Sequence, residues 1–222
     1  MITIVLAESS LELIPSSLHH HPSVTSYSKK FKKSPSQTLL DNSWHFGAMK
    51  GLDNEIKRGR PDIVHLTLLS LCTTPAFFKN KIKVYVHTTD NNVISISNQT
   101  RLPKSYHRFQ GLIEKLFIEK KIKSENDTLM EISFSSLPKL ISKIKPSTIV
   151  GLTTKGQKIT LEKLFEQIPD NSCILIGGFQ KGHYNKDTEK MINESFRIND
   201  SSLEAHVVAG RLIYEYEKTI FI

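Results

Sequence analysis

Short apolar runs alternate along the chain with segments of helical periodicity. Residues 2–7 form a β-branched apolar run, which predicts a buried strand. Residues 82–97 alternate apolar and polar positions on both sides of Thr89-Asp90-Asn91-Asn92, a pattern typical of a β-hairpin. A helix is predicted over 105–121, because five large apolar side chains share one face there: Phe109, Leu112, Ile113, Leu116 and Phe117.

The pattern from residue 129 onwards resembles repeated β–α–β units. Strands are predicted at 129–134, 148–152, 173–176 and 196–198. Helices are predicted between them at 137–144 and 161–168, with an amphipathic helix at 203–217. Alternating strands and helices favour a mostly parallel sheet that is covered by helices on both faces.

The first third of the chain gives a weaker pattern. Ser9 and Ser10 can cap a short helix over 11–14 that stops at Pro15. Residues 16–38 are polar and basic and predict a long loop with room for one helix. Apolar residues recur at helical spacing within 39–58, and residues 63–71 are apolar enough to lie at the centre of the protein.

Composition indicates a folded α/β protein inside the cell. The 222 residues suit one large domain, and 38% hydrophobic residues can form a packed core. The net charge of +8 favours phosphate-rich partners or acidic membrane surfaces. Cys72 and Cys173 each have apolar neighbours and are predicted to be buried rather than bridged. Without a leader-like start or a long apolar stretch, we expect a soluble, cytoplasmic protein.

Glycine-rich segments follow two of the predicted strands. Residues 150–156, VGLTTKG, carry Gly151 and Gly156 at the end of one predicted strand, where an α/β sheet can bind a ligand or simply turn. Residues 177–182 read GGFQKG, which matches neither GxGxxG nor a phosphate-binding loop with a following Lys-Ser/Thr. Before the last helix, Ser202 can act as its cap. A generic nucleotide-binding interpretation is therefore weak.

A basic cluster combines Arg58 and Arg60 with the segment 101–108. Arg101, Lys104 and Arg108 recur at intervals of three and four, which is typical of a solvated face but also suits phosphate oxygens. Aromatic residues interleave with these charges and favour RNA. Asp62 can orient Arg60 or form only a local pair. Three adjacent histidines, His19 to His21, do not have the spacing of a metal site.

Taken together, these motifs resemble one family, the ribosome-biogenesis pseudouridine N1-methyltransferases of the SPOUT superfamily, in its archaeal form. The most specific segment is GRPDIVH at 59–65, and RLPKSYHRFQGL at 101–112 is similar to the RNA-binding segment of the family. The cofactor region is matched by IGGFQKG at 176–182 and by LEA at 203–205. Similar residues in the first half are LELIP at 11–15, HPSV at 21–24, LLD at 39–41, His45 and AMK at 48–50.

The resemblance implies one SPOUT domain over 1–222. It implies a hairpin-and-helix extension at about 78–125, a deep trefoil knot at about 147–222, and a homodimer. The implied cofactor is S-adenosylmethionine, and the implied substrate is small-subunit ribosomal RNA, with neither a metal nor a membrane as partner. Cofactor contacts fall on Leu152, Thr153, Gly177, Gly178, Gly182, Phe196, Arg197, Ile198, Asn199, Asp200, Ser201, Ser202 and Leu203. RNA contacts fall on Arg60, Arg101, Lys104 and Arg108, and the catalytic pair is Arg60 with Asp62.

Three residues depart from the family pattern. Lys104 replaces a common arginine, Ser202 a common proline and His206 a common aromatic residue. Lys104 keeps the charge but loses the bidentate fork of arginine. Two alternatives stay open at this point: a non-catalytic RNA-binding assembly factor with the same fold, and a SPOUT methyltransferase that acts on another RNA.

Overall fold

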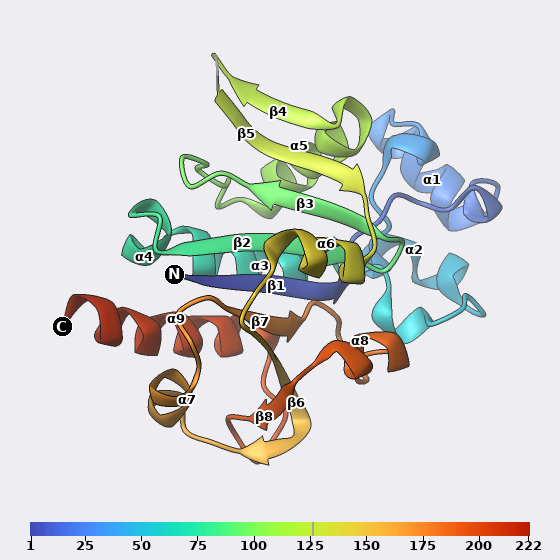
Figure 1. The fold of residues 1–222 in the computed structure, drawn as a ribbon. Coiled ribbons are helices and arrows are strands. Elements are labelled where there is room, and N and C mark those ends of the chain that lie inside the picture. Colours follow the sequence, from blue (N-terminus) through green and yellow to red (C-terminus); the bar gives the residue numbers. More distant parts are fainter. Residues whose placement is uncertain (126) are drawn as a thin grey trace.

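The computed structural model describes residues 1–125 and 127–222, and within them eight strands form one sheet in the order β4-β5-β3-β2-β1-β7-β6-β8 (Figure 1). The strands are β1 (Ile2–Ser9), β2 (Ile82–Thr88), β3 (Asn92–Ile96), β4 (Lys121–Ser124), β5 (Asp127–Phe134), β6 (Thr148–Lys158), β7 (Ser172–Gly177) and β8 (Glu194–Arg197). Five of them, from β2 to β8 in the sheet order, are parallel. Strands β3, β5 and β4 complete one edge in antiparallel pairing. The predicted mostly parallel sheet is confirmed.

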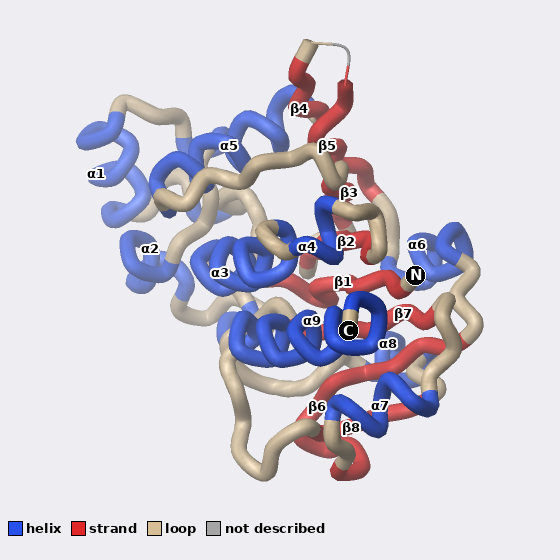
Figure 2. Tube along the Cα trace, turned by 90° about the vertical axis from the view of Figure 1, so that its left-hand side faces the viewer, coloured by secondary structure: helices blue, strands red, loops and turns tan. Residues whose placement is uncertain are grey.

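Helices cover both faces of this sheet (Figure 2). They are α1 (Pro22–Phe31), α2 (Asn42–Met49), α3 (Pro61–Cys72), α4 (Pro75–Phe78), α5 (Tyr106–Glu119), α6 (Leu137–Ile144), α7 (Leu161–Gln167), α8 (Lys186–Met191) and α9 (Ala205–Phe221). Helices α3 and α9 pack side by side on one face, and α6 and α8 lie on the other. In the described residues, no helix has both the length and the apolarity to span a membrane.

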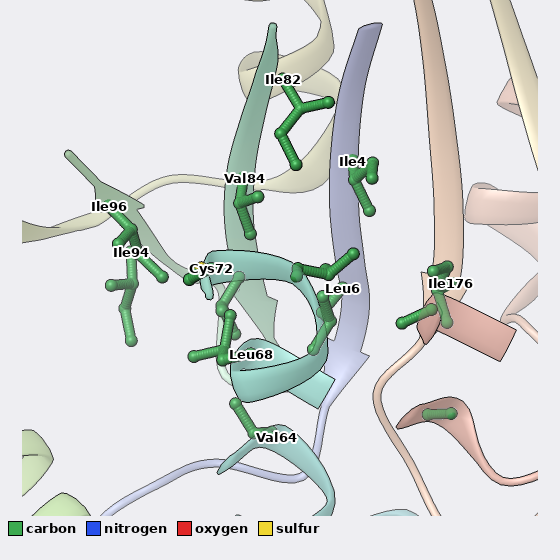
Figure 3. Packing of buried hydrophobic residues seen from close by; sticks show 14 of the residues in the cluster. Ile4, Leu6, Val64, Leu68, Cys72, Ile82, Val84, Ile94, Ile96 and Ile176 are labelled. Atoms are coloured by element: carbon green, nitrogen blue, oxygen red, sulfur yellow. The ribbon is translucent and has the colours of Figure 1, made fainter. Parts of the chain in front are cut away.

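The alternation of side chains along β1 divides the core into two layers. Ile2, Ile4 and Leu6 belong to the larger apolar cluster, which includes Val64 and Leu68 of α3 (Figure 3). Val5 and Ala7 belong to a second cluster with Leu137 and Leu140 of α6. Successive strand residues point to opposite faces, so a strand at the centre of a doubly covered sheet is apolar throughout.

Both cysteines lie in these apolar layers, as predicted. Cys72 is in the larger cluster and Cys173 in the second, and both are buried free thiols. Burial raises the pKa of Cys173 to about 12, because the thiolate form is poorly solvated there. Both thiols act as small apolar core residues.

The predicted hairpin is confirmed, and it is part of the main sheet. Strand β2 pairs in parallel with β1 and antiparallel with β3. The segment that follows then adds α5, β4 and β5 at the edge of the sheet. The predicted helix over 105–121 is confirmed as α5.

The helix predicted over 11–14 is wrong. Leu13 instead forms an isolated antiparallel bridge with Leu39. The N–H of Ile14 donates to the carbonyl of Thr38, and the N–H of Leu40 donates to that of Glu12. Pairing between Leu13 and Leu39, 26 positions apart along the chain, therefore overrides the local serine caps.

Strand β6 is longer than the sequence pattern predicts. Its pairing with β8 shifts register, so that Phe196 pairs with both Leu152 and Gln157. The intervening residues bulge out, and the strand resumes as far as Lys158. A Cβ atom on Gly156 would lie 2.5 Å from the Phe196 nitrogen, which explains why glycine stands there. The knot implied by the resemblance stays a prediction.

Candidate active site

A cavity of about 840 Å³ opens at the carboxyl ends of β7 and β8 and at the bulge of β6. Three segments form it: residues 152–154 of β6, the loop after β7, and the loop between β8 and α9. The carboxyl end of parallel strands is where an open α/β sheet binds ligands. Eleven of the residues predicted to bind cofactor line this cavity, namely Leu152, Thr153, Gly177, Gly182, Phe196, Arg197, Ile198, Asn199, Ser201, Ser202 and Leu203.

Two predicted cofactor residues do not line the cavity. Gly178 packs against the end of β1, where its N–H donates to the Ala7 carbonyl and a Cβ atom would lie 2.2 Å from the Ser9 hydroxyl oxygen. Asp200 is exposed and pairs with Lys158 at 2.7 Å. Gly178 therefore joins the loop after β7 to β1, and Asp200 joins the loop between β8 and α9 to β6.

A second hollow of about 790 Å³ lies between α7 and α9. Charged side chains such as Lys163 and Arg211 line it, and it shares only Phe196 and Ile198 with the first cavity. The loops rich in glycine do not reach it. The first cavity is therefore the candidate active site.

The glycines of the loop after β7 leave space that other residues would fill. A Cβ atom on Gly177 would lie 2.9 Å from the Phe179 ring, which lines the same cavity. Gly182 has a φ of +105°, a conformation that residues with a side chain rarely adopt. The loop can therefore bring its backbone close to a ligand, as the glycine pattern suggests.

Tyr184 supports the floor of the cavity and is not evident in the sequence. Its side chain is buried, and its hydroxyl lies 2.9 Å from the Leu175 carbonyl and 3.1 Å from the Leu152 carbonyl. It thus ties β6 to β7 at the point where both strands reach the cavity. Burial raises its pKa, which keeps the hydroxyl protonated as a donor.

Helix α9 begins at the rim of the cavity. Its first residue is Ala205, and the capping position is Glu204, without a side-chain hydrogen bond. The prediction that Ser202 caps this helix is therefore wrong: Ser202 lies two residues before the cap and lines the cavity. An uncapped helix start leaves backbone N–H groups free to bind a polar ligand.

Arg60 and Asp62 form a bidentate pair at the start of α3. The Arg60 Nε lies 2.8 Å from one oxygen of Asp62 and its Nη2 lies 2.7 Å from the other. The hydrogen bond with Asp62 and the nearby charges of Asp62 and Glu204 raise the pKa of Arg60. The Arg60 N–H donates to the Ser10 carbonyl, and the Ser10 N–H donates to the Gly178 carbonyl, so Arg60 lies beside the loop after β7 that forms part of the cavity.

Lys57 links the loop before Arg60 to the cavity loop. Its Nζ donates to Glu8 at 2.7 Å and to the His183 carbonyl, and it lies 4.3 Å from the centroid of the Phe179 ring. The other oxygen of Glu8 accepts from the N–H of Asn185 at 2.8 Å. Glu8 is buried and has a φ of +52°, a strained conformation that persists where surrounding contacts impose it.

The basic segment 101–108 lies beside α3. The Arg101 guanidinium stacks on Phe78 with its central carbon 3.7 Å from the ring centroid. His65 of α3 contacts the Pro103 carbonyl at 2.8 Å. Arg101 and Lys104 precede α5, and only Arg108 lies within it, so the three do not share one helical face. All three are exposed.

Arg58 and the histidines near residue 20, which the sequence also brings to notice, make contacts that hold the fold together. The Nε of Arg58 donates to Glu12 at 2.7 Å in a two-bond pair, which occupies that guanidinium. His19 contacts the Ile14 carbonyl, and His21 accepts the Ser23 N–H at the start of α1. In the part of the chain that the structure describes, no group of three His, Cys, Asp or Glu side chains could hold a metal ion.

The fold and the cavity define an α/β protein with a candidate ligand site beside the carboxyl ends of parallel strands. Residues 4–217 match the family described as EMG1/NEP1 methyltransferase. The ribosomal RNA small subunit methyltransferase Nep1 of Staphylothermus marinus is 36% identical over 96% of this chain and 93% of its own. That of Thermococcus kodakarensis is 35% identical over 99% of both chains.

A comparison with a solved structure indicates the same family. The crystal structure of Archaeoglobus fulgidus Nep1 bound to S-adenosylhomocysteine has a TM-score of 0.89 and 34% identity, and the match covers 98% of each chain. The chain belongs to the EMG1/NEP1 methyltransferase family. This likeness confirms the predicted SPOUT-type α/β fold class.

Proposed function

We propose that this protein transfers a methyl group from S-adenosylmethionine to N1 of a pseudouridine in small-subunit ribosomal RNA. One observation carries the proposal: the three segments predicted to bind cofactor meet in a single cavity, and the Arg60–Asp62 pair lies beside the loop after β7. The names of the relatives support ribosomal RNA of the small subunit as the substrate.

The cavity suits S-adenosylmethionine. A volume of about 840 Å³ lies within the range of small-molecule sites. Apolar walls from Leu152, Phe179 and Val208 suit a nucleoside, and the backbone of Gly177 can approach it closely. The Archaeoglobus fulgidus relative binds S-adenosylhomocysteine, the product form of this cofactor. The bound cofactor supplies an electrophilic methyl group, so the protein mainly positions the acceptor and excludes water.

Arg60 and Asp62 are proposed to act on the acceptor base. Pseudouridine carries an N1–H that uridine lacks, and negative charge develops on the base as this proton leaves. A cation beside the cavity can stabilise that charge. Both oxygens of Asp62 are occupied by Arg60, so Asp62 orients the guanidinium and is poorly placed to accept a proton. The target nucleotide has to leave its stack to reach the cavity.

The partners follow from the same proposal. Arg60, Arg101, Lys104 and Arg108 contact RNA phosphates, since all lie on or beside α3 with three of them exposed. The protein acts in the cytoplasm as a homodimer, as the resemblance implies. The large exposed side chains of Leu66 on α3 and Tyr214 on α9 are consistent with a protein contact at these helices.

The test uses purified protein, labelled S-adenosylmethionine and matched RNA hairpins that carry uridine or pseudouridine in the loop. We expect label only in the pseudouridine hairpin, and a transfer-RNA stem-loop serves as the control for other RNA classes. Equal labelling of the uridine hairpin would contradict N1 specificity. Tight binding of both hairpins without transfer to either would favour an assembly factor.

A further inference from the structure

A cluster of aromatic side chains reaches the surface where α1 packs against α2. The ring centroids of Phe31 and Trp44 lie 5.5 Å apart, and both are within 5.4 Å of the Tyr27 ring. Tyr27 is buried beneath them, whereas Phe31 and Trp44 are 36% and 41% exposed. Large aromatic side chains that adjoin at a surface indicate a binding site more often than isolated ones do.

The segment that carries this cluster is strongly basic. Between residues 16 and 50 the chain holds five lysines, Lys29, Lys30, Lys32, Lys33 and Lys50, and one acidic residue. That residue, Asp41, is buried and accepts hydrogen bonds from the Ser43 N–H and the Tyr106 hydroxyl. The Lys30 Nζ lies 4.9 Å from the Trp44 ring centroid and 5.4 Å from that of Phe31. The surface is therefore complementary to a polyanion.

This surface is joined to the helix that carries the basic segment. The Gln110 amide of α5 donates to the Tyr27 hydroxyl at 3.4 Å, and Lys33 pairs with Glu114 of α5. Tyr106, the first residue of α5, reaches Asp41 at the start of α2. The aromatic cluster and Arg108 are thus held by one assembly of helices, which Figure 2 shows beside α3.

We propose that Lys30, Phe31 and Trp44 form a stacking platform for unpaired bases of the RNA that flank the target nucleotide. The identity of this RNA rests on the proposed function, but the chemistry of the platform does not. Aromatic rings stack on bases of any sequence, and a lysine beside them attracts the backbone phosphates. Bases within a duplex do not expose their faces, so the platform selects single-stranded segments.

Trp44 is the only tryptophan of the chain and reports directly on the platform. The full chain is titrated with a single-stranded RNA oligonucleotide, with a duplex of the same length, and with polyphosphate, while tryptophan fluorescence is followed. We expect saturable quenching by the single strand and little change with the duplex or with polyphosphate. Equal quenching by polyphosphate, or none by any of the three, would overturn the proposal.

Variants locate the binding. Trp44→Ala is expected to weaken binding of hairpins with unpaired flanks about tenfold, and Trp44→Phe is expected to retain most of it. Phe46→Ala is the matched control, because Phe46 lies on the same helix, is 60% exposed and has no ring contact with the cluster. An equal loss in Phe46→Ala, or none in Trp44→Ala, would overturn the assignment.

Two further measurements separate this proposal from its alternatives. Methyl transfer to a minimal hairpin without flanks is expected to be the same in Trp44→Ala and the parent protein. Quenching by single-stranded RNA without methyl transfer would support the platform and contradict the proposed function. Methyl transfer without quenching would support the proposed function and contradict the platform. Sedimentation of the parent protein and Trp44→Ala is expected to give the same mass; a smaller variant species would mean that a second copy occupies this surface.

Discussion

The Arg60 guanidinium has two of its donors committed to Asp62, which leaves its other N–H groups available to a substrate. We expect Arg60→Ala to lower the methyl-transfer rate about 10²-fold, as the loss of one charge-stabilising donor does elsewhere. Asp62→Asn is expected to lower the rate less, because the amide still offers one acceptor oxygen to the Arg60 guanidinium. Single-turnover rates with the pseudouridine hairpin measure both. Affinity for S-adenosylhomocysteine is the control, and unchanged rates in both variants would contradict the assignment.

Two buried histidines make stability depend on pH. Burial lowers the pKa of His45 and His87, and each accepts a backbone N–H at Nδ1, from Asp41 and Glu8 respectively. Below about pH 6.5, the ordinary histidine value, the unfolded chain therefore binds protons that the folded protein resists. We expect the free energy of unfolding to fall between pH 7.5 and 5.5, and His87→Asn to flatten this fall. Denaturant unfolding measures it, with exposed His107→Asn as control; a parent protein equally stable at both pH values would contradict it.

At the residue scale, sequence motifs identify those site residues whose chemistry is local. Gly177 and Gly182 stand out because a tight loop requires glycine, and Arg60 and Asp62 because they are two positions apart. Glu8 and Tyr184 lack such a signal, because the partners of Glu8 lie 49 and 177 residues further along the chain. Contacts at that separation depend on the sheet order.

The loop after β7 is held by side chains from other elements, among them Lys57, which donates to the His183 carbonyl. We expect Lys57→Met to reduce affinity for S-adenosylhomocysteine about tenfold, because about 1.4 kcal/mol is a typical loss for a charge-assisted contact. Glu8 would then stay buried without its cation, so a fall in stability is expected as well. Calorimetry measures the affinity, and Lys186→Met, an exposed lysine at the start of α8, is the control. Equal affinity in the two variants would exclude a role for Lys57 in the loop.

At the element scale, periodicity predicts α5, β2 and β3 well because each buries a regular face, and a continuous apolar run predicts β7. It fails where pairing decides the conformation. Residues 11–14 are extended because they pair with residues near Leu39. Strand β6 continues past its bulge because Gln157 and Lys158 pair with β8. Helix α1 begins at Pro22 after the cap of His21, a local signal within a segment predicted as mostly loop.

Across the whole molecule, α3 and α5 pack on one face of the sheet and α6 packs on the other (Figure 2). We expect Arg101→Ala and Arg108→Ala each to lower RNA affinity and to reduce the slope of affinity against salt by about 0.7 per lost phosphate contact on single strands. Filter binding at several salt concentrations measures the slope. Lys139→Ala, which removes an exposed charge on α6, is the control. An unchanged slope in Arg101→Ala would mean that its stacking on Phe78 is purely structural.

The place of β1 in the sheet governs when the chain can fold. It pairs with β2 on one side and with β7 on the other, so Thr3 and Cys173 become neighbours. A chain emerging from the ribosome can form the hairpin and α5 early, but the second edge of β1 stays open until β7 arrives. Its apolar run of residues 2–7 is then an unpaired edge of the kind that invites aggregation. Truncation before β7 would leave that edge permanently open, so the product would be an aggregating fragment rather than a smaller folded protein.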